Sequence, residues 1–436
     1  MKITIDKLND EFTFEYLKNN KKYYLNKVIL GETVDVSINE KEAKIQLNNI
    51  INPSENRIKP KCPYFNVCGG CGLQHMNYHY QLSQKEQMVK NLFKGLKCDN
   101  KVLPIKYQKE FNYRNKSQMV YGYDNKRAVT GIYEEHSHHI IPVDVCLLED
   151  EEISKVQKQV KELIDKFHYS YFNEKLNIGT IKHILVKSTT TKEIMVVIVT
   201  KDEVLKGSSN FVKALSKANQ NIKTIVQNIN PTNTTHVLGK VNKVLYGKGY
   251  ITDQLLGFKF QISSKSFYQI NRFITASLYQ EIVDSIKNKN YQTVLDAYSG
   301  TSTISIVVSP YVKKVISVEL ESEACNQALN NVKINDIKNV KVFNEDATRF
   351  IVNLSAKKET IDCVIMDPPR SGATNEFLQS LIKLKPKEII YVSCNPHTQV
   401  RDLEILKNYY TISFIQPFDL FPNTAHVETV CLLTKK

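Results

Sequence analysis

One cysteine near the end of the chain stands where nucleophilic chemistry is possible. Cys394 follows the apolar run EIIYVS (388–393) and precedes Asn395-Pro396. A strand that ends just before a proline turn would present the thiol at a sheet edge, which is where ligands bind in open α/β sheets. The thiolate form of such a cysteine is a strong nucleophile. Position alone fits a buried structural cysteine equally well, so the neighbouring motifs must decide between the two.

Two further groups of polar residues could serve this nucleophile. Asp367 opens the sequence DPPR (367–370), in which two prolines hold the acid in an extended, rigid turn. Rigid presentation of a polar group suits recognition of a planar base edge. Near the end of the chain, His426 and Glu428 are two residues apart, which would place them on one face of a strand. Either side chain could act as a general base.

A third group of residues indicates a pocket for a nucleoside. The turn AYSGTST (297–303) consists of small residues that let a ligand approach the backbone closely. Glu319 ends the next apolar run about twenty residues later, where a carboxylate can accept hydrogen bonds from both ribose hydroxyls. Asp346 ends the third run and is placed to hold an adenine amino group. Acids can also end strands by chance, but turn, spacing and third acid together favour the pocket.

The phosphate-binding motif of dinucleotide sites is missing from the sequence. No Gly-x-Gly-x-x-Gly follows any of the apolar runs. The pattern therefore favours a nucleoside without phosphate, such as S-adenosylmethionine.

Strands that alternate with helices from about residue 290 onward would position these residues. The segments YQTVLDAYSG, KKVISVEL, NVKVFNED, DCVIMDPP and EIIYVSC each hold a short apolar run that ends in polar or small residues. Such runs are typical of a parallel sheet covered by helices. In SEACNQALNNVKIN, Ala324, Ala328 and Val332 recur every four residues, which predicts a helix packed on the sheet. The sequence thus predicts an α/β catalytic domain.

The rest of the chain has a different pattern. Residues 1–55 alternate apolar and polar positions between short turns, which predicts a small β-barrel, and the polar residues 52–61 indicate a linker. Residues 78–96 and 150–167 have helical periodicity, whereas 182–200 has the pattern of a hairpin. We therefore expect a mixed α+β region between the barrel and the catalytic domain.

Four cysteines outside the catalytic domain could bind a metal. Cys62, Cys68 and Cys71 lie within CPYFNVCGGCGLQH, and Cys146 would add a fourth thiolate from a distant part of the chain. Four thiolates suit tetrahedral zinc or an iron–sulfur cluster, and the spacing does not decide between them. The chain has nine cysteines and no export signal, so a disulfide framework is not expected.

Composition narrows the class of partner. Lys and Arg number 59 against 45 Asp and Glu, a net charge of +14. This excess favours a polyanion such as nucleic acid, although a lysine-rich surface can also reflect genome composition. No apolar run approaches the roughly 18 residues of a membrane span, and the charged N-terminus does not resemble a signal peptide. We expect a cytoplasmic protein with several domains and no membrane partner.

Four motifs together resemble those of the RNA uridine-5-methyltransferases. They are Ser393-Cys394-Asn395-Pro396, Asp367-Pro368-Pro369-Arg370, His426-Val427-Glu428 and Phe267-Tyr268-Gln269-Ile270-Asn271. The resemblance covers nearly the whole chain. It implies a Rossmann-like class I methyltransferase domain that uses S-adenosylmethionine to make 5-methyluridine in RNA.

The resemblance implies a covalent mechanism. C5 of uracil is a poor nucleophile, so Cys394 would first add to C6, and the enolate carbon at C5 would then take the methyl group. Glu428 would remove the C5 proton, and β-elimination would release Cys394. The donor-binding residues implied are Gln269, Tyr298, Glu319 and Asp367. Phe267 would fill the place of the uridine, which must leave its stack.

The resemblance also implies a domain organisation and a cluster. Residues 1–55 would form a TRAM-like (OB-like) barrel that binds RNA, 56–73 and 107–260 a central RNA-binding α+β domain, and 74–106 with 261–436 the catalytic domain. The implied ligands of a 4Fe–4S cluster are Cys62, Cys68, Cys71 and Cys146. We expect a monomer without an obligate protein partner.

The substrate follows from the same resemblance. Members with both barrel and cluster typically act on 23S rRNA, which favours 23S rRNA over the tRNA T-loop. Two other functions stay open. A non-catalytic iron–sulfur RNA-binding protein would have no need of Cys394 and Glu428, and a DNA or protein methyltransferase would leave Cys394 idle. One departure from the family is Ser302, where the donor turn usually has a second glycine.

Overall fold

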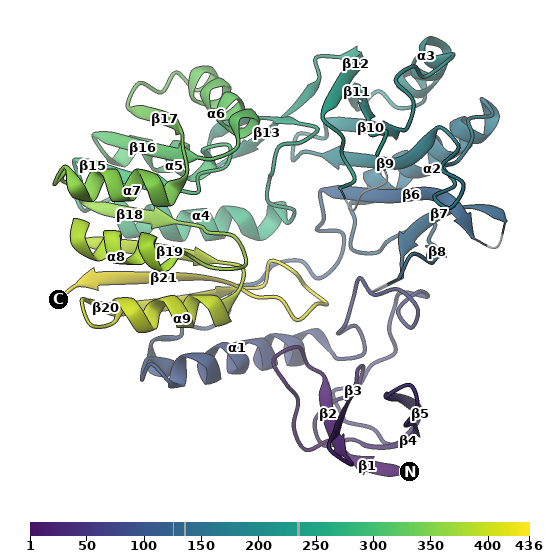
Figure 1. The fold of residues 1–436 in the computed structure, drawn as a ribbon, viewed down its shortest axis with the longest axis horizontal. Coiled ribbons are helices and arrows are strands. Elements are labelled where there is room, and N and C mark those ends of the chain that lie inside the picture. Colours follow the sequence, from purple (N-terminus) through teal and green to yellow (C-terminus); the bar gives the residue numbers. More distant parts are fainter. Residues whose placement is uncertain (125, 135–136, 233–235) are drawn as a thin grey trace.

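The computed structural model describes residues 1–124, 126–134, 137–232 and 236–436. Three regions are visible in Figure 1: a small N-terminal β region, a central region built on one large sheet, and a C-terminal region in which helices cover a second large sheet. The N-terminal region, the central region and the two faces of the C-terminal sheet each have a hydrophobic core. Phe12 and Ile29 of the N-terminal region belong to the core on one face of the C-terminal sheet. Within the described ranges, no helix is long and apolar enough to cross a membrane.

The N-terminal region contains five short strands. β1 (Lys2–Thr4), β4 (Thr33–Asn39) and β5 (Lys44–Asn52) form an antiparallel sheet, and β2 (Phe14–Lys18) pairs with β3 (Lys21–Leu25) in a hairpin. Alternate side chains of these strands face a common core, as the period of two requires. Its buried members are Ile3, Ile5, Phe14, Leu25, Val28, Val34 and Val36.

The central region is a seven-stranded sheet in the order β12-β11-β10-β9-β6-β7-β8. Its strands are β6 (Lys116–Asp124), β7 (Arg127–Tyr133), β8 (Ile140–Pro142), β9 (Ile181–Ser188), β10 (Ile194–Thr200), β11 (Ile222–Ile229) and β12 (Val241–Gly247). The helices α2 (Glu151–Lys166) and α3 (Ser208–Ala218) contribute apolar side chains to the same core. The hairpin predicted at 182–200 is confirmed as β9 and β10, and the helix predicted at 150–167 is confirmed as α2.

The catalytic-domain sheet has the order β17-β16-β15-β18-β19-β21-β20. Its strands are β15 (Thr293–Ala297), β16 (Lys314–Glu319), β17 (Val340–Asn344), β18 (Cys363–Met366), β19 (Glu388–Ser393), β20 (Tyr410–Phe418) and β21 (Glu428–Lys435). The first five are parallel, and they correspond to the five predicted apolar runs. β21 lies antiparallel between β19 and β20. A hairpin of β13 (Tyr250–Leu255) and β14 (Phe258–Ser263) precedes this sheet.

Helices cover both faces of this sheet. One face packs against α1 (Tyr78–Lys94), α7 (Ala347–Ala356), α8 (Asn375–Leu384) and α9 (Pro396–Leu406), and the other against α4 (Arg272–Ile286), α5 (Thr303–Val308) and α6 (Ser322–Ile334). Two short 3₁₀ turns, η1 (Asp99–Lys101) and η2 (Ser309–Tyr311), complete the described elements. Neighbouring residues of one strand reach different cores, since Val294 faces α4 and Leu295 faces α8. This two-sided burial explains why the strand sequences are almost wholly apolar.

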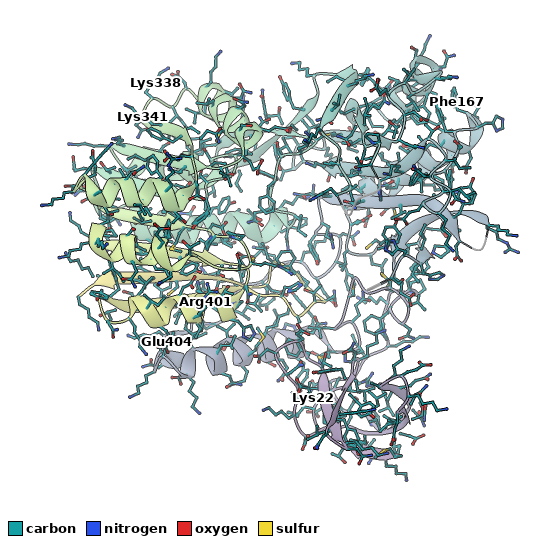
Figure 2. The ribbon with its side chains drawn as sticks, viewed as in Figure 1. Lys22, Phe167, Lys338, Lys341, Arg401 and Glu404 are labelled. Atoms are coloured by element: carbon teal, nitrogen blue, oxygen red, sulfur yellow. The ribbon has the colours of Figure 1, made fainter. Side chains whose placement is uncertain are left out.

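The strand order of this sheet reverses at β15. The chain runs outward from β15 to β16 and β17, and then crosses back to β18 on the other side of β15. In doubly wound sheets, ligands bind at the carboxyl ends of the strands where the order reverses. Charged side chains lie on the outer surface of this region: Arg401 and Glu404 are on α9, Lys338 precedes β17, and Lys341 is in β17 (Figure 2).

Candidate active site

Cys394 lies at the carboxyl edge of the sheet, directly after β19. All six residues of β19 are buried, which fixes the direction in which the chain leaves the strand. Asn395 then caps α9 by accepting a hydrogen bond from the His397 amide at 3.2 Å, and Pro396 takes the first helical position. The half-buried thiol is therefore held between a strand end and a helix start. This is the placement predicted from the sequence.

The turn that follows β18 is fastened to the neighbourhood of Cys394. The Arg370 carbonyl accepts hydrogen bonds from Asn395 Nδ2 at 3.0 Å and from Thr398 Oγ1 at 3.2 Å. Gly372 closes the turn with a φ of +77°, and a Cβ there would meet Asp402 Oδ2 at 2.8 Å. The turn thus needs glycine at this position, and the structure holds the Asp367 segment beside the thiol.

Glu428 comes from the other neighbour of β19. It is the first residue of β21, and its side chain is buried. Ser393 and Thr429 are Cα partners in the antiparallel pairing, so Glu428 reaches the sheet edge next to Cys394. His426 lies before the strand and is exposed, so the prediction that it shares a strand face with Glu428 is wrong. The chain at His426 belongs to the preceding loop, and its Nε2 lies 3.2 Å from Arg370 Nη2.

The pKa values of Cys394, Glu428 and Asp367 are all raised, and these groups influence one another. The pKa of Cys394 is raised to about 11, chiefly by burial and then by the charges of Glu428 and Asp367, and Arg370 opposes the increase. Burial also raises the pKa of Glu428 well above its usual range, with a further contribution from Asp367 and opposition from Arg370. The pKa of Asp367 rises to about 7 through burial and through the charge of Asp296. Thiol, two acids and one guanidinium therefore form one electrostatic unit.

Asp296 is a site residue that the sequence reasoning missed. It lies in β15, is fully buried, and accepts hydrogen bonds from the Ser305 amide at 3.0 Å and hydroxyl at 2.6 Å. Its Oδ1 has no hydrogen-bond partner within the described parts of the chain. Burial raises its pKa to about 7, although Ser305 opposes this. The available signal was an acid inside the apolar run TVLDA, one residue before the small-residue turn.

The small-residue turn has the geometry of a ligand-binding loop. Tyr298, Gly300 and Ser302 have φ values of +64°, +55° and +60°, which lie in the left-handed region. The Gly300 amide donates to Glu319 Oε2 at 2.8 Å, so the turn and the end of β16 are joined. Ser302 is fully buried, and its hydroxyl lies 2.6 Å from that of Ser317. The serine thus occupies a position that favours glycine, with its side chain turned into the protein and away from the pocket.

The other predicted donor residues lie around this turn. Burial raises the pKa of Tyr298 to about 12, with a smaller contribution from the charge of Asp346. Asp346 is exposed and caps α7 by accepting a hydrogen bond from the Arg349 amide at 2.9 Å. Gln269 is buried just before α4, and its side chain hydrogen-bonds Tyr279.

Tyr279 connects the donor side with the reactive side. Burial raises its pKa above the usual range, with contributions from the charges of Asp367, Asp296 and Glu428. Gln269 therefore lies close to the three acids. Phe267, two residues earlier, is 71% exposed, which is unusual for a phenylalanine. Most of the Phe267 ring is therefore accessible to solvent.

The four cysteines of the predicted metal site are electrostatic neighbours. All four are free thiols and half-buried. Burial raises the pKa of Cys71 to about 11, and Cys68 and Cys62 contribute; burial raises that of Cys146 to about 12, and Glu149 and Cys71 contribute. Within the described residues, however, no group of three or more His, Cys, Asp or Glu side chains is arranged to hold a metal ion. The structure brings the thiols into one neighbourhood without arranging them as a metal site.

Strand order, helices on both faces, the antiparallel β21 and the turn at the point where the order reverses define a class I S-adenosylmethionine-dependent methyltransferase fold. Comparison with solved structures gives the same class. The chain matches the crystal structure of the Pyrococcus abyssi tRNA (uracil-54, C5)-methyltransferase in complex with S-adenosyl-L-homocysteine, with a TM-score of 0.79 and 25% identity over 100% of both chains.

Sequence comparison narrows the class to a family. Residues 77–436 match the family model tRNA (Uracil-5-)-methyltransferase. The chain is 39% identical over 423 residues to an uncharacterized RNA methyltransferase of Clostridium tetani, covering 95% of this chain and 92% of that protein. It is 37% identical over 435 residues to one of Staphylococcus epidermidis, covering 98% and 91%. The chain therefore belongs to the tRNA (uracil-5-)-methyltransferase family, which confirms the resemblance seen in its motifs.

Proposed function

We propose that this protein methylates C5 of a uridine in 23S rRNA through a covalent bond between Cys394 and C6 of the base. S-adenosylmethionine-dependent methylation of RNA at uracil C5 is the reaction of the family. The observation that carries the mechanism is the placement of Cys394 and Glu428 at the ends of adjacent antiparallel strands, β19 and β21. In this proposal, Cys394 supplies the nucleophile and Glu428 the base at the same sheet edge.

The covalent steps of the proposal are those that the family resemblance implies, and the placement of Cys394 and Glu428 supports them. The Cys394 thiolate adds to C6, and the electron pair of the C5–C6 double bond moves into an enolate. C5 of the enolate attacks the methyl group of S-adenosylmethionine, and S-adenosylhomocysteine leaves. Glu428 takes the proton from C5, the double bond re-forms, and the C6–sulfur bond breaks to return the thiolate. The raised pKa of Glu428 makes its carboxylate a stronger base for this step, with Arg370 as the neighbouring cation.

In this proposal, the donor lies at the carboxyl ends of β15 and β16, where the strand order reverses. Glu319 would accept the ribose hydroxyls, since its carboxylate is already held at the turn by the Gly300 amide. Asp346 would bind the adenine amino group beside Tyr298, and Gln269 with Asp367 would face the methionine part of the donor. Phe267 would replace the extruded uridine, a role that its exposed ring permits.

The substrate choice rests on the regions outside the catalytic domain. Residues 1–55 would act as a TRAM-like RNA-binding element, and 56–73 with 107–260 as a second one. The net charge of +14 favours a polyanionic substrate. The tRNA T-loop is the second candidate, because both the family model and the Pyrococcus abyssi enzyme are named for tRNA.

A 4Fe–4S cluster on Cys62, Cys68, Cys71 and Cys146 is part of the proposal. Four thiolates are a suitable donor set, and the four thiols influence one another electrostatically. Such a cluster would join the segment that follows the N-terminal sheet to the segment that follows β8. Its test is the absorbance of an anaerobic preparation, which should be brown and should lose its colour in Cys62→Ser. A colourless protein loaded with zinc would overturn the assignment.

The decisive experiment is tritium release from RNA that carries 5-tritiated uridine. With the methyl donor present, 23S rRNA transcripts should release tritium and tRNA transcripts should not. Cys394→Ala should lower the rate by several orders of magnitude, because the covalent step is lost. Cys98→Ala, at a half-buried cysteine outside the site, is the matched control and should keep the wild-type rate.

Each alternative outcome has a definite meaning. Release from tRNA alone would keep the chemistry and replace the substrate. No release from either RNA, in a preparation that binds donor and RNA, would favour a non-catalytic RNA-binding protein. Full activity in Cys394→Ala would exclude the covalent mechanism.

A further inference from the structure

The loop between β20 and β21, residues 419–427, leads directly into Glu428. Four consecutive carbonyl groups of this loop accept hydrogen bonds from donors outside the two strands. The pairs are Leu420 with Asn271 Nδ2 at 3.0 Å, Phe421 with Lys85 Nζ at 3.2 Å, Pro422 with the Tyr113 hydroxyl at 3.1 Å, and Asn423 with the amides of Gly72 and Leu73, both at 3.0 Å. The loop is thus held along its length by other parts of the chain.

These donors come from four separate segments. Asn271 caps α4, Lys85 lies on α1, and Tyr113 lies just before β6. Gly72 and Leu73 follow Cys71 directly, so they belong to the cysteine segment, residues 62–73. The path of the loop therefore depends on the fold of a segment that contributes no side chain to the reactive centre described above.

Asn423 is the point where these segments meet. It is fully buried and has a φ of +66°, a left-handed conformation that asparagine tolerates better than most residues. Its Oδ1 accepts a hydrogen bond from Gln81 Nε2 at 3.2 Å, and its Nδ2 donates to the Glu110 carbonyl at 3.3 Å. Backbone and side chain of one residue thus contact the cysteine segment, α1 and the segment before β6.

A buried ion pair holds the start of the loop. Lys85 Nζ lies 2.6 Å from Asp419 Oδ1, and both side chains of this ion pair are fully buried. The Tyr78 hydroxyl donates to Asp419 Oδ2 at 2.8 Å. A buried ion pair contributes little net stability, and its best-supported use is to fix one arrangement of the chain. Here it fixes the loop on α1.

The far end of the loop faces the reactive centre. The His426 ring packs edge-on against Phe421 with centroids 5.9 Å apart, and its Nε2 lies 3.2 Å from Arg370 Nη2. Glu428 follows two residues later. Cys394, by contrast, is carried by β19 and α9. A displacement of the loop would therefore move Glu428 and His426 while Cys394 stays in place.

We propose that Asn423 is a positioning residue through which the cysteine segment sets the placement of Glu428. This inference rests on the proposed function, because it assigns proton removal to Glu428 and nucleophilic attack to Cys394. Disturbing Asn423 or the cysteine segment slows resolution of the covalent RNA adduct more than its formation. A residue that acts only on folding would lower both steps, through the amount of folded enzyme.

The test is a single-turnover experiment on Asn423→Gly. Glycine keeps the left-handed backbone accessible and removes both side-chain hydrogen bonds. Adduct formation is followed on denaturing gels and proton removal by tritium release from 5-tritiated RNA. We expect formation within about twofold of the wild type and resolution slower by about tenfold, so that the adduct accumulates, as for other losses of general-base placement.

The matched control is Asn339→Gly. The Asn339 side chain donates to the Ser309 carbonyl at 2.8 Å and the Val312 carbonyl at 2.9 Å, at the amino edge of the same sheet. It ties a loop as Asn423 does but lies far from the site, so both steps should stay at wild-type rates per folded enzyme. If Asn423→Gly does not fold, Gln81→Leu removes one of its two side-chain bonds and should show the same selective slowing, by a smaller factor.

Cys71→Ser tests the cysteine segment itself. It should accumulate adduct as Asn423→Gly does, and the double variant should slow resolution by less than the product of the two single effects, because the carbonyl and the side chain of Asn423 hold the same residue in place. Amide hydrogen exchange at 420–427 should rise in both variants, which is a readout independent of turnover.

Different results would refute the proposed function and the positioning role of Asn423. A wild type that forms no adduct and releases no tritium would refute the proposed function. A wild type that turns over normally, with formation and resolution slowed equally in Asn423→Gly, would refute only the positioning role.

Discussion

The carboxylates on the donor side of the sheet edge and those on the reactive side lie in different surroundings. On the donor side, Glu319 accepts a backbone hydrogen bond from Gly300, and Asp346 is exposed at the start of α7. On the reactive side, Glu428 is buried, and Asp367 adds a second acid close by. Backbone amides donate hydrogen bonds to the donor-side acids, whereas burial beside another acid favours the protonated form of Glu428. In the proposed function, the donor side is the binding half of this sheet edge and the reactive side is the reacting half.

The largest expected effect comes from the reacting half. Glu428→Gln keeps the shape of the side chain and removes its ability to take the C5 proton. Turnover should fall by about 10²- to 10⁴-fold, while a slowly resolving RNA adduct appears on denaturing gels. Glu388→Gln is the control, because Glu388 is a buried acid at the opposite end of β19, bonded to Tyr291 at 2.6 Å. Full turnover without adduct in Glu428→Gln would remove Glu428 from the mechanism.

A substitution in the binding half should weaken the affinity for S-adenosylhomocysteine. Glu319→Ala removes a charged acceptor of hydrogen bonds, and bonds to charged groups contribute about 1.5–3 kcal/mol each. S-adenosylhomocysteine should therefore bind about 10- to 100-fold more weakly by titration calorimetry, while Cys394 still forms the RNA adduct. Glu323→Ala, at a half-exposed acid on α6, should leave affinity unchanged. Equal loss of adduct formation and donor binding in Glu319→Ala would mean that the two halves are not separate.

A smaller effect should come from Arg370, the cation of the reacting half. The guanidinium lowers the pKa of Cys394 and of Glu428 against the effect of burial, so Arg370→Gln should raise both pKa values. The thiol loses its proton only as pH rises toward its pKa. The rising limb of adduct formation against pH should therefore move to higher pH, with a loss of less than about tenfold at any one pH, because Arg370 is exposed and screened.

Arg349→Gln serves as the control for this profile. Arg349 is an exposed arginine on α7, on the donor side. Its replacement should leave the pH profile of adduct formation where it is in the wild type. An identical profile in Arg370→Gln would show that the guanidinium does not act on the thiol.

The direction of each strand explains which site residues could be predicted from the sequence. Four of the parallel strands, β15, β16, β18 and β19, are almost wholly buried, while β17 at the side of the sheet is mostly exposed. The end of each of the five apolar runs marks a position at the ligand edge. This logic places Glu319, Asp346, Asp367 and Cys394 at the edge from the pattern of apolar runs alone. It works because parallel strands align their carboxyl ends whatever their order in the sheet.

The same logic could not place the residues around β21. That strand runs antiparallel between β19 and β20, so its first residue, not its last, reaches the ligand edge. The sequence pattern offered His426 and Glu428 as alternative bases, and the motif resemblance favoured Glu428. The predicted strand position of His426 was wrong because the strand begins two residues later. Asp296 was missed because a single acid inside an apolar run gives no periodic signal. The contacts of Asn423 join segments more than 300 residues apart, as its bond to Glu110 does.

The smallest predicted effect concerns Ser302 in the donor turn, which stands where the family resemblance leads us to expect a glycine. Ser302 adopts a left-handed conformation, which costs a residue other than glycine about 1–2 kcal/mol. Its buried bond to Ser317 offsets that cost, since an unpaired buried hydroxyl costs about 1–3 kcal/mol. Ser302→Gly alone should therefore change the free energy of unfolding by less than about 1 kcal/mol. In a Ser317→Ala background the same change should stabilise the protein by about 2 kcal/mol, because it removes both the strain and the orphaned hydroxyl.

Urea unfolding of the four variants in this cycle measures both effects. The affinity for S-adenosylhomocysteine should stay within about twofold throughout, because the Ser302 hydroxyl points to Ser317 and away from the donor. Equal effects of Ser302→Gly in both backgrounds would mean that the two hydroxyls do not compensate for the strain. A large loss of affinity would mean that the serine contacts the donor, and the binding half would then extend to residue 302.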